Sequence, residues 1–95
     1  MIYEWDENKR RLNLEKHGLD FYDADLVFEA PDKLTVTCAH SSEERWQDIA
    51  EIAGELVVLS LVYVYRSEIV RVISLRPASS KERSLYYEQT HPPQQ

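Results

Sequence analysis

The basic residues best suited to holding a phosphate group gather in the last third of the chain. Residues 66–95 contain five of them, four being arginines, against three acidic residues, although the whole chain has a net charge of −6. An arginine guanidinium binds phosphate oxygens in a planar, bidentate way. The overall acidity argues against a broad nucleic-acid-binding surface, which needs many clustered bases. It leaves room for one local anion site, built from Arg66, Arg71, Arg76, Lys81 and Arg83.

The spacing of three of these arginines predicts which of them share a surface. Successive side chains of a strand point to opposite faces of its sheet. In a strand that contains residues 66–76, Arg66 and Arg76 therefore share one face, and Arg71 points to the other face among isoleucines, unless a β-bulge intervenes. Arg71 is then either a salt-bridged or snorkelling structural residue or a functional one. Arg76, directly before Pro77, is open to both interpretations.

A second polar group lies near the amino terminus. Lys9, Asn13 and His17 are spaced by four residues and would share one face of a helix. His17 could act as a general acid or base, or it could be a cation stabilised by the negative end of the helix dipole. Cys38 and His40 provide too few ligands for a structural zinc site. The sequence contains no hydrolase, zinc-protease or nucleotide-binding motif, so we expect no metal and no cofactor.

N-cap residues and the spacing of apolar residues predict the helices and strands that must position these side chains. We expect helices near residues 7–17, 21–28 and 80–88, with N-caps at Asp6, Asp20 and Ser79 or Ser80. Strands are expected at 2–5, 33–37, 45–53, 56–64 and 69–75. The short spacings between the later strands favour hairpins, hence an antiparallel sheet of about four strands. With two early helices on one face of the sheet and a closing helix, the fold class is α+β.

Length and composition limit the class of protein. With 95 residues and 43% hydrophobic residues, the chain is expected to form one domain at 1–88, followed by a flexible tail at 89–95. It has no apolar run long enough to cross a membrane, and its acidic first residues do not resemble a signal peptide. A single cysteine, Cys38, fits a reducing compartment. The expected location is the cytoplasm.

Motifs spread over residues 3–87 resemble the BrnT toxins of BrnT/BrnA toxin–antitoxin systems. The amino-terminal part of the pattern is Trp5-Asp6, Lys9, Asn13, Lys16-His17-Gly18, Phe21, Ala24 and Val27-Phe28. The later part is Glu44-Arg45, Gly54, Arg71-Val72-Ile73-Ser74-Leu75-Arg76-Pro77-Ala78, Glu82-Arg83 and Tyr86. The opening and closing blocks are specific as a pair, because they occur in order along nearly the whole chain. The resemblance implies a RelE/ParE-like fold.

The resemblance also implies an activity, namely a metal-independent endoribonuclease that arrests growth until a BrnA-like antitoxin binds it. In such a reaction the RNA 2′-OH attacks the adjacent phosphate, and arginines stabilise the charge that develops there. The implied catalytic residues are Arg76, Arg66, Arg45, Glu44 and Lys9, and those implied to bind RNA or antitoxin are Arg83, Arg71, His17 and Tyr86. The proton acceptor could be Glu44, His17 or Lys9. DNA is expected to be bound only through the antitoxin complex.

Two other functions remain open at this point. A toxin with a ParE-like fold could bind DNA gyrase instead of cleaving RNA, and an inactive relative could retain antitoxin binding alone. The net charge of −6 favours these two, whereas the basic residues Lys9, Arg45, Arg66, Arg76 and Arg83 favour a nuclease.

Overall fold

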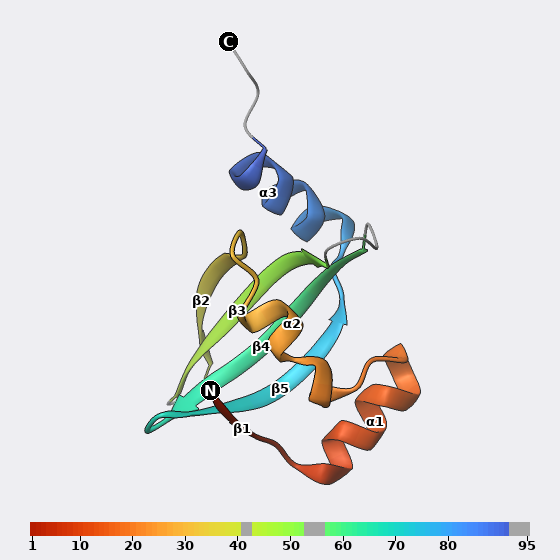
Figure 1. Ribbon diagram of the computed structural model, residues 1–95, viewed down its shortest axis with the longest axis vertical. Helices are drawn as coiled ribbons and strands as arrows, with labels where there is room; N and C mark the ends of the chain where they lie inside the picture. The colour runs from red at the N-terminus through yellow and green to blue at the C-terminus, as the bar shows by residue number, and fades with distance from the viewer. Residues whose placement is uncertain (41–42, 53–56, 92–95) are drawn as a thin grey trace.

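A five-stranded sheet forms the centre of the molecule (Figure 1). The computed structural model describes residues 1–40, 43–52 and 57–91. Its strands follow the spatial order β1-β5-β4-β3-β2 and comprise β1 (Ile2–Glu4), β2 (Leu34–His40), β3 (Glu43–Ile52), β4 (Val57–Arg66) and β5 (Ile69–Pro77). β2 to β5 pair as an antiparallel meander, as predicted. The expectation of a purely antiparallel sheet is wrong, because β1 adds to β5 as a parallel edge strand.

The first and last helices begin at the caps that the sequence predicts. In α1 (Glu7–His17), the Asp6 side chain accepts a hydrogen bond from the Lys9 N–H, and Gly18 ends the helix with a left-handed φ of 70°. In α3 (Ser80–Thr90), Ser79 and Glu82 form a complete capping box. α3 extends two residues past the expected end at 88, and residues 92–95 of the expected tail lie outside the described part of the chain.

The single helix predicted at 21–28 is two short pieces. A 3-10 turn, η1 (Phe21–Asp23), precedes α2 (Asp25–Phe28). Asp20 caps the turn at Tyr22, and the Ala24 N–H then bonds to the Phe21 carbonyl, three residues back. Such tight bonding changes the helical period but still turns the apolar side chains of both pieces towards the sheet.

The main core lies between these two pieces and one face of the sheet. Figure 1 shows α2 in front of the strands, with α1 beside β5. The buried members of this core are Phe21, Ala24, Val27, Phe28, Ala50, Leu59, Leu61, Tyr63, Val70, Val72 and Leu75. The prediction that both early helices cover this face is therefore wrong for α1. That helix has one buried residue, Asn13, and packs along the β5 edge.

The second face of the sheet is covered at one end by α3. Tyr86 packs there in a smaller buried cluster with Ile49, Val58 and Ala78. Residues of β3, β4 and β5 that alternate with the main core point to this same face. Its other end carries the polar and basic side chains described below. No helix in the described ranges is both long and apolar enough to cross a bilayer.

Candidate functional site: an arginine-bearing sheet face and an adjoining cleft

A β-bulge in β5 decides which arginines lie together. Tyr63 pairs with Val72, but the preceding residue Val62 pairs with Ser74, so Ile73 is an extra residue in β5. Val70, Val72 and Leu75 consequently all reach the main core, although their numbers differ in parity. The β5 residues that alternate with these three, namely Arg71 before the bulge and Ser74 and Arg76 after it, share the opposite face of the sheet.

The predicted segregation of Arg71 from Arg76 is therefore wrong. Arg71 pairs with Val64 of β4, and Arg76 pairs with Ser60; all four positions belong to the second face. Arg66 also lies on this face, at the end of β4. Arg71 shares the face of Arg66 because the hairpin turn pairs Arg66 with Ile69 and Val64 with Arg71, and the bulge, which an alternating pattern does not reveal, then brings Arg76 to the same face.

Arg45 of β3 completes the set. It alternates with Trp46, which packs on the main core, and shares its parity with Ile49 of the smaller cluster under α3. We call the surface that bears Arg45, Arg66, Arg71 and Arg76 the arginine face. Three neighbouring strands supply these four residues, so the sheet holds cations that are up to 31 positions apart in sequence on one surface.

Two of the four arginines have loose acidic neighbours. Arg66 Nε lies 3.5 Å from a Glu43 carboxylate oxygen, and Arg71 Nη1 lies 3.5 Å from a Glu4 carboxylate oxygen. Both pairs are partly exposed to solvent, and exposed pairs of this kind contribute little to stability. A phosphodiester, whose two non-bridging oxygens share one negative charge, can therefore compete with these carboxylates for the guanidinium groups.

Arg76 is held far more firmly. Its Nη1 and Nη2 atoms donate to the two Glu82 carboxylate oxygens at 2.8 and 2.9 Å, in a bidentate pair. Glu82 also accepts bonds from Gln47 Nε2 and from the Ser79 backbone N–H. The hydrogen bonds from Arg76 are the main reason that the pKa of Glu82 falls to about 2, and bonding to Glu82 raises the pKa of Arg76. Gln47 bonds to the buried Ser60 as well, so this network fastens α3 to the sheet.

The second predicted polar group lies beside the arginine face. A shallow cleft of about 250 Å³ between α1 and β5 is lined by Lys9, Leu12, Asn13, Lys16, His17, Ile73 and Ser74. Ser74 belongs to the arginine face and lies between Arg71 and Arg76 along β5. The cleft thus places the ammonium groups and the imidazole of α1 next to the strand that carries two arginines.

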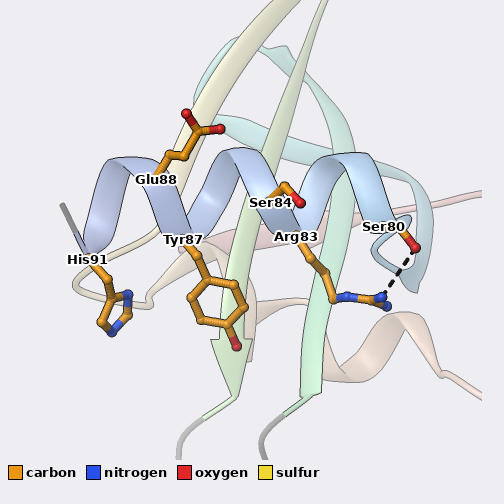
Figure 2. Close-up of a pocket in the computed structure, with 6 residues that line it drawn as sticks. All are labelled: Ser80, Arg83, Ser84, Tyr87, Glu88 and His91. Carbon is orange, nitrogen blue, oxygen red and sulfur yellow. Dashed lines mark hydrogen bonds between the residues drawn. The ribbon is translucent and has the colours of Figure 1, made fainter. Parts of the chain in front are cut away.

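Three predicted site residues lie away from this surface. Glu44 alternates with Arg45, so it points to the α2 side of the sheet. Tyr86 is fully buried beneath α3, where its hydroxyl donates to Asp32. Arg83 lies on α3 in a separate groove with Tyr87 and His91, as Figure 2 shows.

Sequence reasoning did not assign a site role to Glu43, Gln47, Glu82 or Ser74. The pair Ser79 and Glu82 is visible in the sequence as a capping box, but its second role towards Arg76 depends on tertiary contacts. Much of the acidity of the chain lies elsewhere, including the acidic residues Asp25, Glu29, Asp32 and Glu51, which line a cleft beside α2. The overall charge therefore does not describe the arginine face, where four arginines meet the carboxylates of Glu4, Glu43 and Glu82. Within the described residues, no three His, Cys, Asp or Glu side chains are grouped to hold a metal ion.

The fold and the site define a small α+β domain with an arginine-bearing sheet face and an adjoining lysine–histidine cleft. Residues 5–82 match the family described as the ribonuclease toxin BrnT of type II toxin–antitoxin systems, and the chain belongs to this family. It is also similar to the ribonuclease toxin BrnT of Brucella abortus, whose crystal structure was determined at 1.1 Å resolution. The sequence identity is 31%, the TM-score is 0.60, and the match covers 84% of this chain and 100% of the other. No curated protein matches the chain.

Proposed function

We propose that this chain is a metal-independent endoribonuclease that binds RNA on the arginine face and cleaves it where the α1–β5 cleft opens onto that face. The observation that carries the proposal is the β5 bulge, which brings Arg71 and Arg76 to one surface on either side of Ser74. Lys9 and His17 line the cleft at Ser74. The family description supplies the reaction class, since it names a ribonuclease toxin.

The chemistry needs a base, an acid and positive charge. A base removes the proton of the RNA 2′-OH, whose oxygen then attacks the adjacent phosphorus as the 5′-oxygen leaves and takes up a proton. The products are a 2′,3′-cyclic phosphate and a 5′-hydroxyl. We assign removal of the 2′-OH proton to His17, because a neutral imidazole accepts a proton, and water supplies the proton that the leaving 5′-oxygen takes up on the opposite side of the phosphorus. Of the other two candidates, Glu44 points away from the arginine face, and Lys9 lines the same cleft as His17, where we assign it to charge stabilisation.

Positive charge comes from the protein in this proposal. The phosphorane formed during attack carries more negative charge than the starting phosphodiester, so fixed cations favour it. Arg71 and Lys9 flank Ser74 from the strand and from the helix and are placed to supply this charge. Arg45 and Arg66 bind phosphates farther along the strand of RNA. Arg76 contributes positive charge to this surface without donating hydrogen bonds to RNA, because both of its terminal nitrogens donate to Glu82.

A type II toxin has a protein antitoxin, and we propose a BrnA-like partner that covers the arginine face with acidic side chains. Such a partner would compete directly with RNA. The complex would bind DNA through the antitoxin, since the toxin alone has a net charge of −6 and its bases are confined to one surface.

One assay tests the proposal against its two rivals. Purified protein, freed of antitoxin, is incubated with a labelled RNA in EDTA and separately with DNA gyrase. We expect RNA cleavage with cyclic-phosphate ends, strongly reduced but still measurable in His17→Ala and weakened in Arg71→Ala, and no effect on gyrase. Gyrase inhibition without cleavage would support the protein-binding toxin. An intact RNA together with antitoxin binding would indicate an inactive relative. An absolute requirement for Mg²⁺ would replace this mechanism with a metal-assisted one.

A further inference from the structure

Asn13 makes an unusual contact between a helix side chain and a strand backbone. Its Nδ2 donates to the Leu75 carbonyl at 2.7 Å, and its Oδ1 accepts from the Leu75 N–H at 3.2 Å. The same Nδ2 donates to the Leu19 carbonyl at 3.0 Å, just beyond the end of α1. The Asn13 side chain is thus fully engaged and buried, with 9% of the residue exposed.

This contact takes the place of a strand neighbour. β1 runs beside β5 only as far as the pair Glu4 and Arg71, so the β5 edge beyond that pair has no strand partner among the described residues. The amide of Asn13 presents one donor and one acceptor to Leu75, as a neighbouring peptide group would. It therefore satisfies a backbone edge that would otherwise face solvent or another chain.

The position of α1 depends on this amide more than on apolar packing. Asn13 is the one buried residue of α1, while its large apolar residues Leu12 and Leu14 are 64% and 38% exposed. Arg10 of α1 also pairs with Asp20 at 3.0 Å and lies over the Tyr22 ring, but these contacts join α1 to the turn that follows it and not to β5. Without a buried apolar stripe, the contact of α1 with β5 needs another group to set its rotation and its position along the strand. The hydrogen bonds to Leu75 specify both, because they are directional.

Asn13 also lies midway between the two groups assigned to the reaction. Lys9 and His17 are four residues before and after it, on the same face of α1. Leu75, its partner in β5, lies between Ser74 and Arg76. We propose that Asn13 is a positioning residue that sets Lys9 and His17 against Ser74 and Arg71 for RNA cleavage. This inference rests on the function proposed above.

The test uses a substitution that preserves the hydrogen-bonding groups. Asn13→Gln keeps the amide but lengthens its side chain by one methylene, so α1 can stay bonded to Leu75 only by shifting. Since small displacements of reacting groups can lower rates by about 10²-fold, we expect kcat to fall at least about tenfold. KM for RNA should change less than about threefold, because the arginine face, which binds RNA, is untouched. Asn13→Ala should also lower kcat with little change in KM, and it should speed hydrogen exchange at the Leu75 amide.

The matched control separates positioning from loss of stability. Thr35→Val removes a 2.7 Å hydrogen bond to the buried Asp48 on the α2 side of the sheet, away from the cleft. It should lower the melting temperature while leaving kcat and KM unchanged. A double-mutant cycle adds a second readout: in a His17→Ala background, Asn13→Gln should have a much smaller effect on the residual rate.

The possible results distinguish this inference from the function it rests on. Wild-type protein that leaves RNA intact would overturn both. Wild-type cleavage with unchanged kcat in Asn13→Gln would overturn the positioning role alone. Equal losses of kcat in Asn13→Gln and in Thr35→Val would also overturn it, since general destabilisation would then explain the loss. Full additivity in the double-mutant cycle would show that Asn13 does not act through His17.

Discussion

At the scale of single residues, Arg76 has a structural role that its position in a motif does not reveal. It connects the end of β5 to the first turn of α3 through Glu82, whose carboxylate also accepts hydrogen bonds from Gln47 Nε2 and the Ser79 N–H. Removing the guanidinium leaves a partly buried carboxylate without its main partner. Arg76→Ala should therefore lower the free energy of unfolding by about 1–3 kcal/mol, measured by urea titration.

The expected control for this prediction is Arg45→Ala. Arg45 lies on the same face but outside the Glu82 network, so its removal should change stability by less than about 0.5 kcal/mol. Both substitutions should weaken RNA binding if the arginine face is the binding surface. An Arg76→Ala protein as stable as the wild type would show that the bidentate pair does not fasten α3.

Glu82 gives the protein a specific weakness to acid. Its pKa is about 2 in the folded protein, against 4.5 for a glutamate in its ordinary range, so folding favours the charged form. The stabilisation is complete above about pH 4.5 and is lost as the pH falls towards 2. Because 21% of the side chain is exposed, we expect about 1–2 kcal/mol from this group.

The measurement is the free energy of unfolding between about pH 7 and about pH 2.5, the range that spans the loss of this charge. Glu82→Gln should be less stable than wild type at neutral pH, and the difference should shrink towards the acid end. Glu88→Gln removes the same charge from the exposed side of α3 and should follow the wild-type profile. A constant gap between Glu82→Gln and wild type over the whole range would contradict the assignment.

At the scale of elements, the end of α1 depends on one backbone conformation. Gly18 has a φ of 70°, in the left-handed region, and its N–H bonds to the Leu14 carbonyl. A Cβ there would meet no atom within 4 Å, so the cost of a side chain is backbone strain alone. We expect Gly18→Ala to lower stability by about 1 kcal/mol and Gly18→Asn by less, which thermal unfolding would resolve as a shift of about 4–8 °C for Ala. Equal melting temperatures for the two variants would contradict this ranking.

Local chemistry made several elements predictable from the sequence. Asp6, Ser79 and Gly18 act within a few residues of themselves, and the apolar run of β4 is long enough to identify a buried strand. The parallel pairing of β1 and the position of α1 at the sheet edge were not predictable in this way. Both depend on contacts between residues more than 60 positions apart, such as Asn13 with Leu75.

The candidate site was predictable in its residue types but not in its geometry. The cations of α1 and the arginines of β5 are visible in the sequence, and the structure brings them together at Ser74. Which arginines share a surface depends on two features of the ladder: the hairpin turn, which pairs Arg66 with Ile69, and Ile73, an inserted residue that reverses the parity of everything after it. An alternating pattern of Ile, Val and Leu does not distinguish a regular strand from this bulged one.

At the scale of the whole molecule, the separation of charges predicts how RNA binding should depend on salt. Single-stranded nucleic acid releases about 0.7 counterion per neutralised phosphate. With Arg45, Arg66 and Arg71 as the main contacts, a plot of log affinity against log salt should have a slope of about −2. Each of these arginines changed to Ala should reduce the slope by about 0.7, measured with an uncleavable RNA. Arg83→Ala is the control and should leave the slope unchanged, because Arg83 lines the separate groove on α3 and does not belong to the arginine face.

The same separation predicts where an antitoxin binds. A partner that inhibits by competition must cover the arginine face, because that surface holds the cations proposed to bind RNA. Desolvated arginine pairs at the centre of such an interface would dominate its affinity. We therefore expect one antitoxin per toxin to block cleavage and to protect Arg45, Arg66 and Arg71 from an arginine-specific reagent, read by mass spectrometry. Arg83, which faces the groove of Figure 2, should stay reactive. If Arg83 is protected while the arginine face still reacts, inhibition is indirect, and the route from antitoxin to active site must run through α3 and its link to Arg76.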